Sequence, residues 1–137
     1  MGFMTIRYAE ISDYLWLKDH ERYISDKILV SKISAKEVYV VEEDEELWGW
    51  LRYNLFWDNV PFMNKLFLLE KCRRRGIGKR LVHYWENDML KNGYTNVLTS
   101  TQSNEDAQHF YRKLGYTEIG GLRFLDDPLE IIFYKKL

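Results

Sequence analysis

Cysteine is nearly absent from this sequence. Cys72 is the only one among 137 residues, so no intramolecular disulfide can form and a cysteine-based zinc site is excluded. No run of about 18 apolar residues occurs, which argues against a transmembrane helix, and residues 1–7 lack the apolar core of a signal peptide. We therefore expect a cytoplasmic protein without a membrane partner.

An excess of charge of one sign is also missing. Lys and Arg number 20 against 21 Asp and Glu, which gives a net charge of −1. Proteins that bind nucleic acids generally are clearly basic, so we expect no nucleic-acid partner. The length fits a single domain over residues 1–137, and a hydrophobic content of 46% can supply its core.

The spacing of apolar residues alternates between the periods of strands and helices. Strands are expected at 3–9, 38–41, 47–57, 60–69, 97–101, 116–119 and 129–134. Helices are expected from 12 to 23, over 25–33, from 77 to the Asn92-Gly93 stop signal and over 107–114. The pattern predicts a mixed α/β fold around one central sheet of about seven strands with about four helices.

Three further local features are informative, and two of them have two interpretations. The acidic run Glu42–Glu46 is expected at a hairpin tip, either as a solvated turn or as an attractor of a cationic amine. The spacing of Ser103 and Asp106 matches a capping box for the following helix. The aromatic residues between 48 and 57 are expected to be core or pocket wall.

The segment 66–79 carries the strongest chemical signal. An apolar strand is followed by Lys71 and three arginines, and Gly76 and Gly78 then open an amphipathic helix. Free N–H groups and the helix dipole hold an anion at such a position, and arginine adds forked donors. This arrangement suits a pyrophosphate, although a basic turn with glycines needed only for the bend is the alternative.

Two familiar nucleotide motifs do not fit this turn. No Gly-Lys-Ser/Thr closes it, as a P-loop requires, and the first glycine of a Rossmann fingerprint is absent. The run Arg73-Arg74-Arg75-Gly76-Ile77-Gly78 instead resembles the Gln/Arg-x-x-Gly-x-Gly/Ala signature of the GCN5-related N-acetyltransferase (GNAT) superfamily. Residues 104–116 resemble its second motif, Asn-x-x-Ala-x-x-Phe-Tyr-x-x-x-Gly-Phe/Tyr. Both motifs stand in the family's order, and the strand order agrees along essentially the whole chain.

The resemblance implies an acyl-CoA N-acyltransferase fold, with a mostly antiparallel mixed sheet, and acetyl-CoA as co-substrate. The backbone of the signature turn would bind the coenzyme pyrophosphate, and the preceding strand would bind the pantetheine arm. A V-shaped slot between the strands ending near Leu69 and Thr101 would hold the thioester, with an N–H near Leu68 or Leu69 polarising its carbonyl. The implied coenzyme-binding residues are Leu66, Phe67, Leu68, Arg73, Arg74, Arg75, Gly76, Ile77, Gly78, Lys79, Asn104 and Tyr111.

The resemblance also nominates catalytic residues. Tyr111 matches the tyrosine that often protonates the departing thiolate, although it could simply be a core aromatic. Glu70 replaces a frequent proline, and it could act as a base or be a surface residue paired with Lys71 or Arg73. Thr99 stands where some N-terminal acetyltransferases carry a glutamate, which leaves the general base open and puts an N-terminal acetylation role in doubt.

The expected activity is transfer of acetyl to a primary amine of a small molecule or peptide by direct attack. The alternative is an acyl-CoA-binding module without turnover. The three histidines lack the spacing of metal ligands, so no metal is expected. Cys72 lies beside arginines that could lower its pKa, although no partner makes it a nucleophile. Many members of the family form dimers, and the resemblance leaves a homodimer open.

Overall fold

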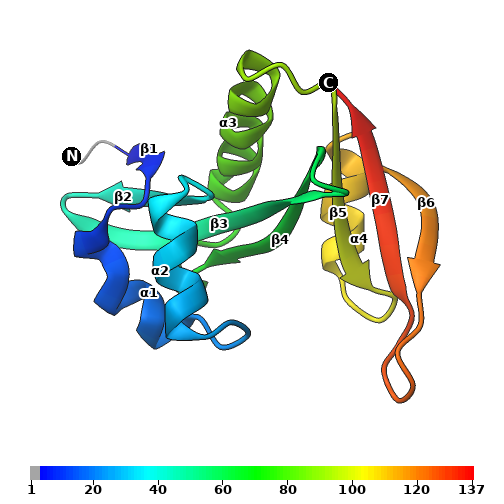
Figure 1. The fold of residues 1–137 in the computed structure, drawn as a ribbon, viewed down its shortest axis with the longest axis horizontal. Coiled ribbons are helices and arrows are strands. Elements are labelled where there is room, and N and C mark those ends of the chain that lie inside the picture. Colours follow the sequence, from blue (N-terminus) through cyan, green and yellow to red (C-terminus); the bar gives the residue numbers. More distant parts are fainter. Residues whose placement is uncertain (1–3) are drawn as a thin grey trace. The chain divides into compact units, whose positions relative to one another are not determined.

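A computed structural model describes residues 4–137 as a seven-stranded sheet with four α-helices and two short 3-10 helices (Figure 1). The strand order is β1-β2-β3-β4-β5-β7-β6. In chain order the elements are β1 (Met4–Tyr8), η1 (Ile11–Asp13), α1 (Tyr14–His20), α2 (Asp26–Ser34), β2 (Val38–Glu43), β3 (Glu46–Phe56), β4 (Val60–Leu68), η2 (Glu70–Cys72), α3 (Ile77–Lys91), β5 (Asn96–Gln102), α4 (Ala107–Lys113), β6 (Thr117–Leu122) and β7 (Glu130–Lys136).

The predicted mixed, mostly antiparallel sheet is confirmed. The pairs β1–β2, β2–β3, β5–β7 and β6–β7 are antiparallel, and β4 pairs with β5 in parallel at Phe62–Leu98 and Met63–Thr99. The expected first strand included Phe3, which lies outside the described residues. No helix within residues 4–137 combines the length and the apolar character needed to cross a membrane.

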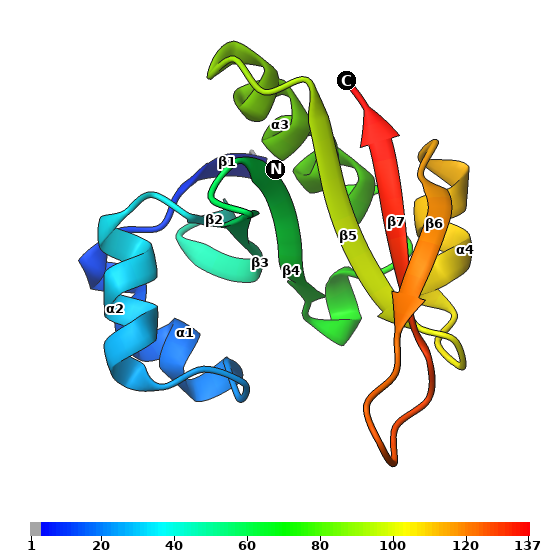
Figure 2. The same cartoon turned by 45° about the vertical axis from the view of Figure 1, so that its right-hand side comes forward.

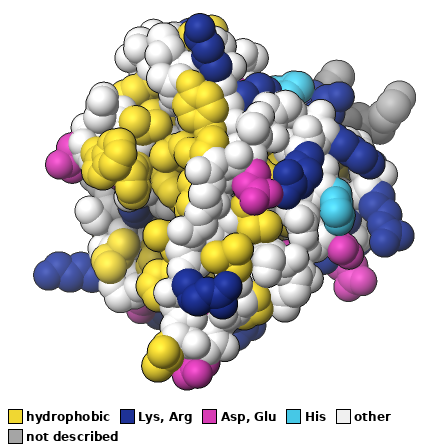
Figure 3. Space-filling model, turned by 90° about the vertical axis from the view of Figure 1, so that its right-hand side faces the viewer, with side chains coloured by type: hydrophobic (Ala, Val, Ile, Leu, Met, Phe, Trp, Pro, Cys, Tyr) yellow, Lys and Arg dark blue, Asp and Glu magenta, His cyan; other side chains and the backbone are white. Residues whose placement is uncertain are grey.

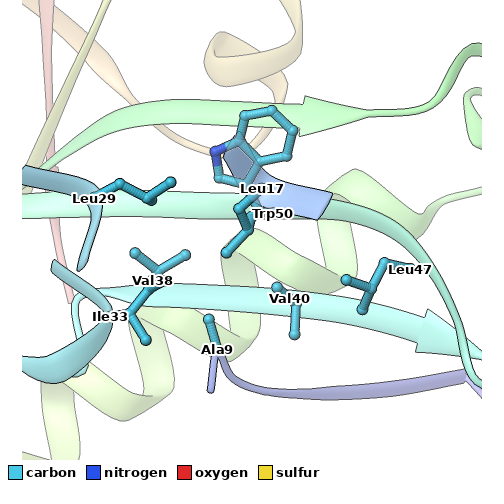
Figure 4. Packing of buried hydrophobic residues seen from close by; sticks show 8 residues of the cluster. All are labelled: Ala9, Leu17, Leu29, Ile33, Val38, Val40, Leu47 and Trp50. Carbon is cyan, nitrogen blue, oxygen red and sulfur yellow. The ribbon is translucent and has the colours of Figure 1, made fainter. Parts of the chain in front are cut away.

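The chain forms two compact units, which are described separately here. The first comprises the chain up to Tyr53 together with Lys65–Trp85, and the second comprises Asn54–Asn64 together with Glu86–Leu137. Helices α1 and α2 cover one face of β2 and β3 in the first unit (Figure 4). The cluster on that face consists of Ala9, Leu17, Leu29, Ile33, Val38, Val40, Leu47 and Trp50.

The other face of β2 and β3 packs against the first part of α3. Tyr39 lies between the inward-pointing Val38 and Val40, so its ring points to the opposite side and meets Tyr84 at 5.9 Å. Tyr53 meets Trp85 at 5.9 Å in the same way. The strands are therefore buried on both faces, which explains their nearly continuous apolar sequence.

In the second unit, α4 lies against the sheet formed by β5, β7 and β6 (Figure 2). Tyr111 of α4 contacts Tyr116 and Phe133, at 5.6 and 6.4 Å between ring centroids. A buried polar cluster in the same unit is formed by Glu86, Tyr116 and Lys135. Glu86 accepts hydrogen bonds from the Tyr116 hydroxyl at 2.7 Å and from Lys135 at 3.0 Å. Each charged or polar atom of that cluster thus has a partner, as burial requires.

Helix α1 ends at His20, three residues before the predicted end. The Glu21 carboxylate accepts the backbone N–H groups of Arg22 and Tyr23, and it forms a buried ion pair with Arg52 at 3.1 Å. These bonds hold Glu21 in an extended conformation and stop the helix. The partner on β3 lies 31 residues away in the sequence, so local spacing carries no sign of this stop.

The capping box predicted at Ser103 is not formed. Helix α4 begins at Ala107, and its N-cap Asp106 makes no side-chain cap hydrogen bond. Glu105 instead accepts the Gln102 N–H at 2.7 Å, and the Gln108 amide donates to the Ser103 and Glu105 carbonyls. The same polar residues therefore stabilise a turn before the helix rather than its first turn.

A glycine permits a close backbone contact between β3 and β4. A Cβ placed on Gly49 would lie 2.2 Å from the Phe67 carbonyl oxygen and 2.7 Å from a Leu68 methyl. We expect Gly49→Ala to lower the free energy of unfolding by about 3 kcal/mol, because the backbone would have to move. Urea unfolding measures this change.

The matched control is Gly120→Ala. Gly120 also lies in a strand, and a Cβ there meets nothing within 4 Å, so we expect a change of no more than ~0.5 kcal/mol. Equal stabilities for the two variants would show that β3 and β4 do not approach as described.

Candidate functional site

The signature turn connects the end of β4 to α3 within the first unit. The chain leaves β4 at Leu68 and forms the short helix η2, which the sequence did not predict. Arg74 and Gly76 then adopt left-handed backbone conformations, with φ of 64° and 76°. Glycine has no penalty for that conformation, whereas arginine does, so the turn holds a strained residue next to a permissive one.

The start of α3 presents free backbone donors. Its first hydrogen bond runs from the Arg80 N–H to the Gly76 carbonyl at 3.1 Å. The N–H groups of Ile77, Gly78 and Lys79 precede that bond and have no partner within the helix. Space around Gly76 is open, since a Cβ there would meet no atom within 4 Å. An anion can therefore approach the backbone and the positive end of the helix dipole.

The arginines of the turn have different surroundings. The Arg73 Nε donates to the Leu68 carbonyl at 3.1 Å, and its guanidinium lies 6.0 Å from the Phe67 ring. The Arg75 guanidinium lies 4.9 Å from the Trp48 ring. Arg74 is exposed and has no such contact among the described residues. Arg73 and Arg75 are thus positioned by β3 and β4, whereas Arg74 extends into solvent.

Of the two backbone N–H groups expected to polarise the thioester carbonyl, those of Leu68 and Leu69, one is already bonded within the protein. The Leu69 N–H donates to the Trp48 carbonyl at 2.8 Å, so it is not available to a ligand. Leu68 remains the expected donor at the end of β4. The slot proposed between β4 and β5 is still a prediction, since it involves both units.

Glu70 begins η2 with an exposed side chain. Neither expected pairing is formed: Lys71 pairs with Glu46, and Arg73 uses its backbone N–H to bind the Glu70 carbonyl at 3.2 Å. Among residues 4–137, no ion pair or side-chain hydrogen bond includes the Glu70 carboxylate, so its role as a base stays a prediction.

Cys72 has the opposite character to the one its neighbours suggested. It is buried, with 1% of its surface exposed, and burial raises the pKa of its thiol despite Lys71 and Arg75. A buried thiol with a raised pKa is a poor nucleophile. Cys72 is therefore part of the packing beneath the turn.

The second unit holds the other two site residues, Asn104 and Tyr111. Asn104 is exposed in the turn before α4 and, among the described residues, makes no side-chain hydrogen bond. Tyr111 is 6% exposed. Burial raises the pKa of its phenol, and a hydrogen bond with Thr99 opposes that shift. The Thr99 hydroxyl donates to the Met63 carbonyl at 3.0 Å, so Thr99 is a buried, hydrogen-bonded residue beside Tyr111.

Two cavities among the described residues are lined by other residues than the predicted site residues. One of about 620 Å³ lies between β1, η1 and α2 in the first unit. Another of about 390 Å³ lies in the second unit, on the sheet face of Leu98, Ile132 and Tyr134. No group of three His, Cys, Asp or Glu side chains within residues 4–137 is arranged to hold a metal.

The fold is that of acyl-CoA N-acyltransferases. A GNAT-family acetyltransferase from Bacillus cereus matches with a TM-score of 0.79 and 26% identity, over 98% of both chains. The ribosomal-protein-S18-alanine N-acetyltransferase from Escherichia coli matches with a TM-score of 0.80 and 18% identity, over 98% of this chain and 94% of that one. Naa50 from Arabidopsis thaliana was solved with a bisubstrate analogue containing CoA. It matches with a TM-score of 0.79 and 19% identity, over 98% of this chain and 99% of that one.

The sequence itself agrees with this assignment. The model of the acetyltransferase (GNAT) family matches residues 4–116, which include the signature turn and the second motif. The chain therefore belongs to the acetyltransferase (GNAT) family. No curated protein matches the sequence.

The buried tyrosines predict a specific alkaline instability. Burial raises the pKa of Tyr111 and, together with Glu86, that of Tyr116. Above pH ~10 the unfolded chain loses phenolic protons that the folded chain keeps, so stability falls as pH rises. We expect Tyr111→Phe to reduce that loss between pH ~8 and ~11, as measured by urea unfolding. Tyr23→Phe, at an exposed tyrosine, is the control, and an equal slope for all three proteins would contradict the burial of Tyr111.

Proposed function

We propose that this protein is an N-acetyltransferase that moves acetyl from acetyl-CoA to a primary amine of a small molecule or peptide. The observation that carries this proposal is the start of α3. Free N–H groups, an open Gly76 and two positioned arginines meet there, which is the chemistry that a pyrophosphate needs. Family membership supports coenzyme A as the source of that pyrophosphate. The solved relative with a CoA-containing bisubstrate analogue supports the same choice.

The residues have separate roles in the proposed donor site. The turn 73–79 holds the pyrophosphate, and the backbone of Leu66, Phe67 and Leu68 binds the pantetheine arm as an added strand would. Asn104 contacts the same arm through its amide, as the family resemblance implies. We also propose that the chain acts as a single domain in the cytoplasm, which its lone, buried Cys72 supports.

The proposed reaction is a direct attack in a ternary complex. The amine lone pair forms a bond to the thioester carbonyl carbon, and the Leu68 N–H stabilises the resulting oxyanion. The C–S bond then breaks, and the thiolate leaves as the nitrogen loses its proton. Tyr111 donates a hydrogen bond to that sulfur. Because the pKa of Tyr111 is raised well above that of a thiol, we propose that hydrogen bonding, more than full proton transfer, is its contribution.

The acidic hairpin lends little support to a cationic acceptor. Asp44 and Glu45 form the turn itself, with φ of 53° and 65°. Glu42 pairs with Arg7 at 2.9 Å, and Glu46 pairs with Lys71. Two of the five carboxylates are therefore engaged within the protein, which agrees with the interpretation as a solvated turn. The identity of the acceptor amine is left to experiment.

Turnover tests the proposal directly. The protein is mixed with acetyl-CoA and a panel of amines that includes peptides, and free thiol is followed over time. We expect amine-dependent thiol release, reduced by about 10²-fold in kcat by Tyr111→Phe. Tyr84→Phe on α3 is the control and should retain the parent rate.

Binding distinguishes the remaining outcomes. We expect acetyl-CoA to bind the parent protein and to bind Gly78→Glu and Arg73→Ala more weakly, because both changes act on the pyrophosphate turn. Binding without turnover in a broad panel would favour a module that only binds acyl-CoA. The absence of binding, with these variants behaving like the parent, would remove the whole proposal.

We further propose that the protein forms a homodimer through an apolar face of the second unit. The cavity on that face is lined only by uncharged residues, among them Trp57, Ile119 and Leu122. These three side chains are 81%, 58% and 50% exposed. Figure 3 shows hydrophobic side chains gathered on the side where β6 and β7 lie in Figure 1. Trp57 also has a positive φ of 57°, a costly conformation for a large side chain.

A second copy is the occupant that this face fits. An uncharged surface can face itself in a two-fold dimer without opposing like charges. The exposed Phe124 and Leu125 of the β6–β7 loop add apolar surface to the same unit, 61% and 96% exposed, and a standard interface buries ~800 Å² per partner. Asp126 and Asp127 follow them in the β6–β7 loop and disfavour an anionic membrane surface.

Light scattering at rising protein concentration tests the dimer. We expect the parent to reach twice its chain mass, and Trp57→Asp to remain monomeric, because the carboxylate would be buried unpaired. Leu15→Asp, at an exposed leucine of the first unit, is the control and should leave the dimer intact. A parent protein that stays monomeric, or a Trp57→Asp dimer, would contradict this interface.

A further inference from the structure

His20 has no role in the site described above, and it lies next to β4, the strand proposed to bind acetyl-CoA. It is the last residue of α1, and its half-buried ring stacks on Trp16 with centroids 4.1 Å apart. Its ring also lies 6.0 Å from Phe67 of β4 and 6.4 Å from Trp50 of β3. The imidazole thus belongs to an aromatic wall formed by Trp16, Trp50 and Phe67 in the first unit.

The hydrogen bond of His20 fixes which nitrogen is basic. Nδ1 lies 2.8 Å from the Trp16 carbonyl oxygen. A carbonyl oxygen can only accept, so Nδ1 carries the hydrogen in the neutral ring. The lone pair then resides on Nε2, as in histidines that act as bases. The stacking on Trp16 holds this ring orientation.

The carboxylate that follows His20 cannot take this role. Glu21 is buried in its ion pair with Arg52, so its charge is already compensated. Charged groups of both signs lie on the surrounding elements. Asp19 precedes His20 on α1, Lys18 pairs with Asp26 of α2 at 3.4 Å, and Glu46 of β3 pairs with Lys71. Arg73 lies over the ring of Phe67, and Lys65 lies 4.6 Å from the ring of Tyr23. Asp26 and Glu46 are engaged in these ion pairs and Asp19 is exposed, so the His20 ring is the basic group within the aromatic wall.

We propose that Nε2 of His20 is the general base that removes the proton from the acceptor amine. Phe67 belongs to the strand segment proposed to bind the pantetheine arm and precedes Leu68, the proposed donor to the thioester carbonyl. The reacting amine would therefore approach along the wall that contains His20. As the nitrogen bonds to the carbonyl carbon, its proton passes to Nε2, and the imidazolium later returns the proton to solvent. This proposal rests on the acetyltransferase activity proposed above.

Two variants separate a base from a packing residue. His20→Phe keeps an aromatic ring against Trp16 and removes the nitrogen lone pair, whereas His20→Ala opens a space that free imidazole can enter. We expect each to lower kcat by about 10²-fold or more while acetyl-CoA binding stays unchanged. We also expect imidazole added to the solution to restore part of the activity of His20→Ala. His83→Phe, at a half-buried histidine of α3, is the control with parent activity.

The pH dependence gives a readout that packing alone does not produce. The kcat of the parent should rise with pH, because only an unprotonated ring nitrogen can accept the proton of the amine. His20→Phe should lack that rise. Parent turnover with His20→Phe retaining both the rate and the rise would overturn the role of His20 alone. A parent that binds acetyl-CoA but acetylates no amine would overturn both proposals.

Discussion

The rest of the candidate site depends on the close approach of β3 and β4 at Gly49. The Phe67 carbonyl lies where any Cβ would project, so the two backbones meet without a side chain between them. The Leu69 N–H then bonds to the Trp48 carbonyl and fixes the point at which the chain leaves the sheet. The signature turn begins just after that point. Gly49 on β3 therefore helps to determine where the turn after β4 lies.

The same approach organises two faces of the first unit. On one side, Trp48 supplies the ring against which Arg75 lies. On the other, Trp50 meets Phe67 at 4.5 Å between ring centroids and extends the aromatic wall toward His20. The proposed anion site and the proposed base are therefore positioned by adjacent residues of two strands. A shift of β4 would disturb both, so their geometry is coupled through packing rather than through a direct contact.

The features that could be predicted from the sequence are those set by local chemistry. Ser25 caps α2 through the Ile28 N–H, and the glycine signal at Gly76 corresponds to a positive φ. The mixed sheet followed from the order of strand and helix periods. The end of α1 and the burial of Cys72 could not be predicted, because each is decided by residues distant in the sequence. The exposure of Trp57 could not be predicted either, since an aromatic residue in an apolar run usually belongs to the hydrophobic core.

For Tyr111, too, the sequence motif gives the residue type, whereas the folded environment sets its chemistry. The motif specifies a phenol but not its acidity, which burial and Thr99 determine. A phenol whose pKa is raised keeps its proton throughout the neutral range, so it is always ready to donate a hydrogen bond to developing charge on sulfur. The same shift makes loss of that proton unfavourable, since a thiolate is the weaker base of the two. In the proposed reaction the proton released by the amine therefore leaves by another group, and His20, whose Nδ1 is bound to the Trp16 carbonyl, offers Nε2 as its acceptor.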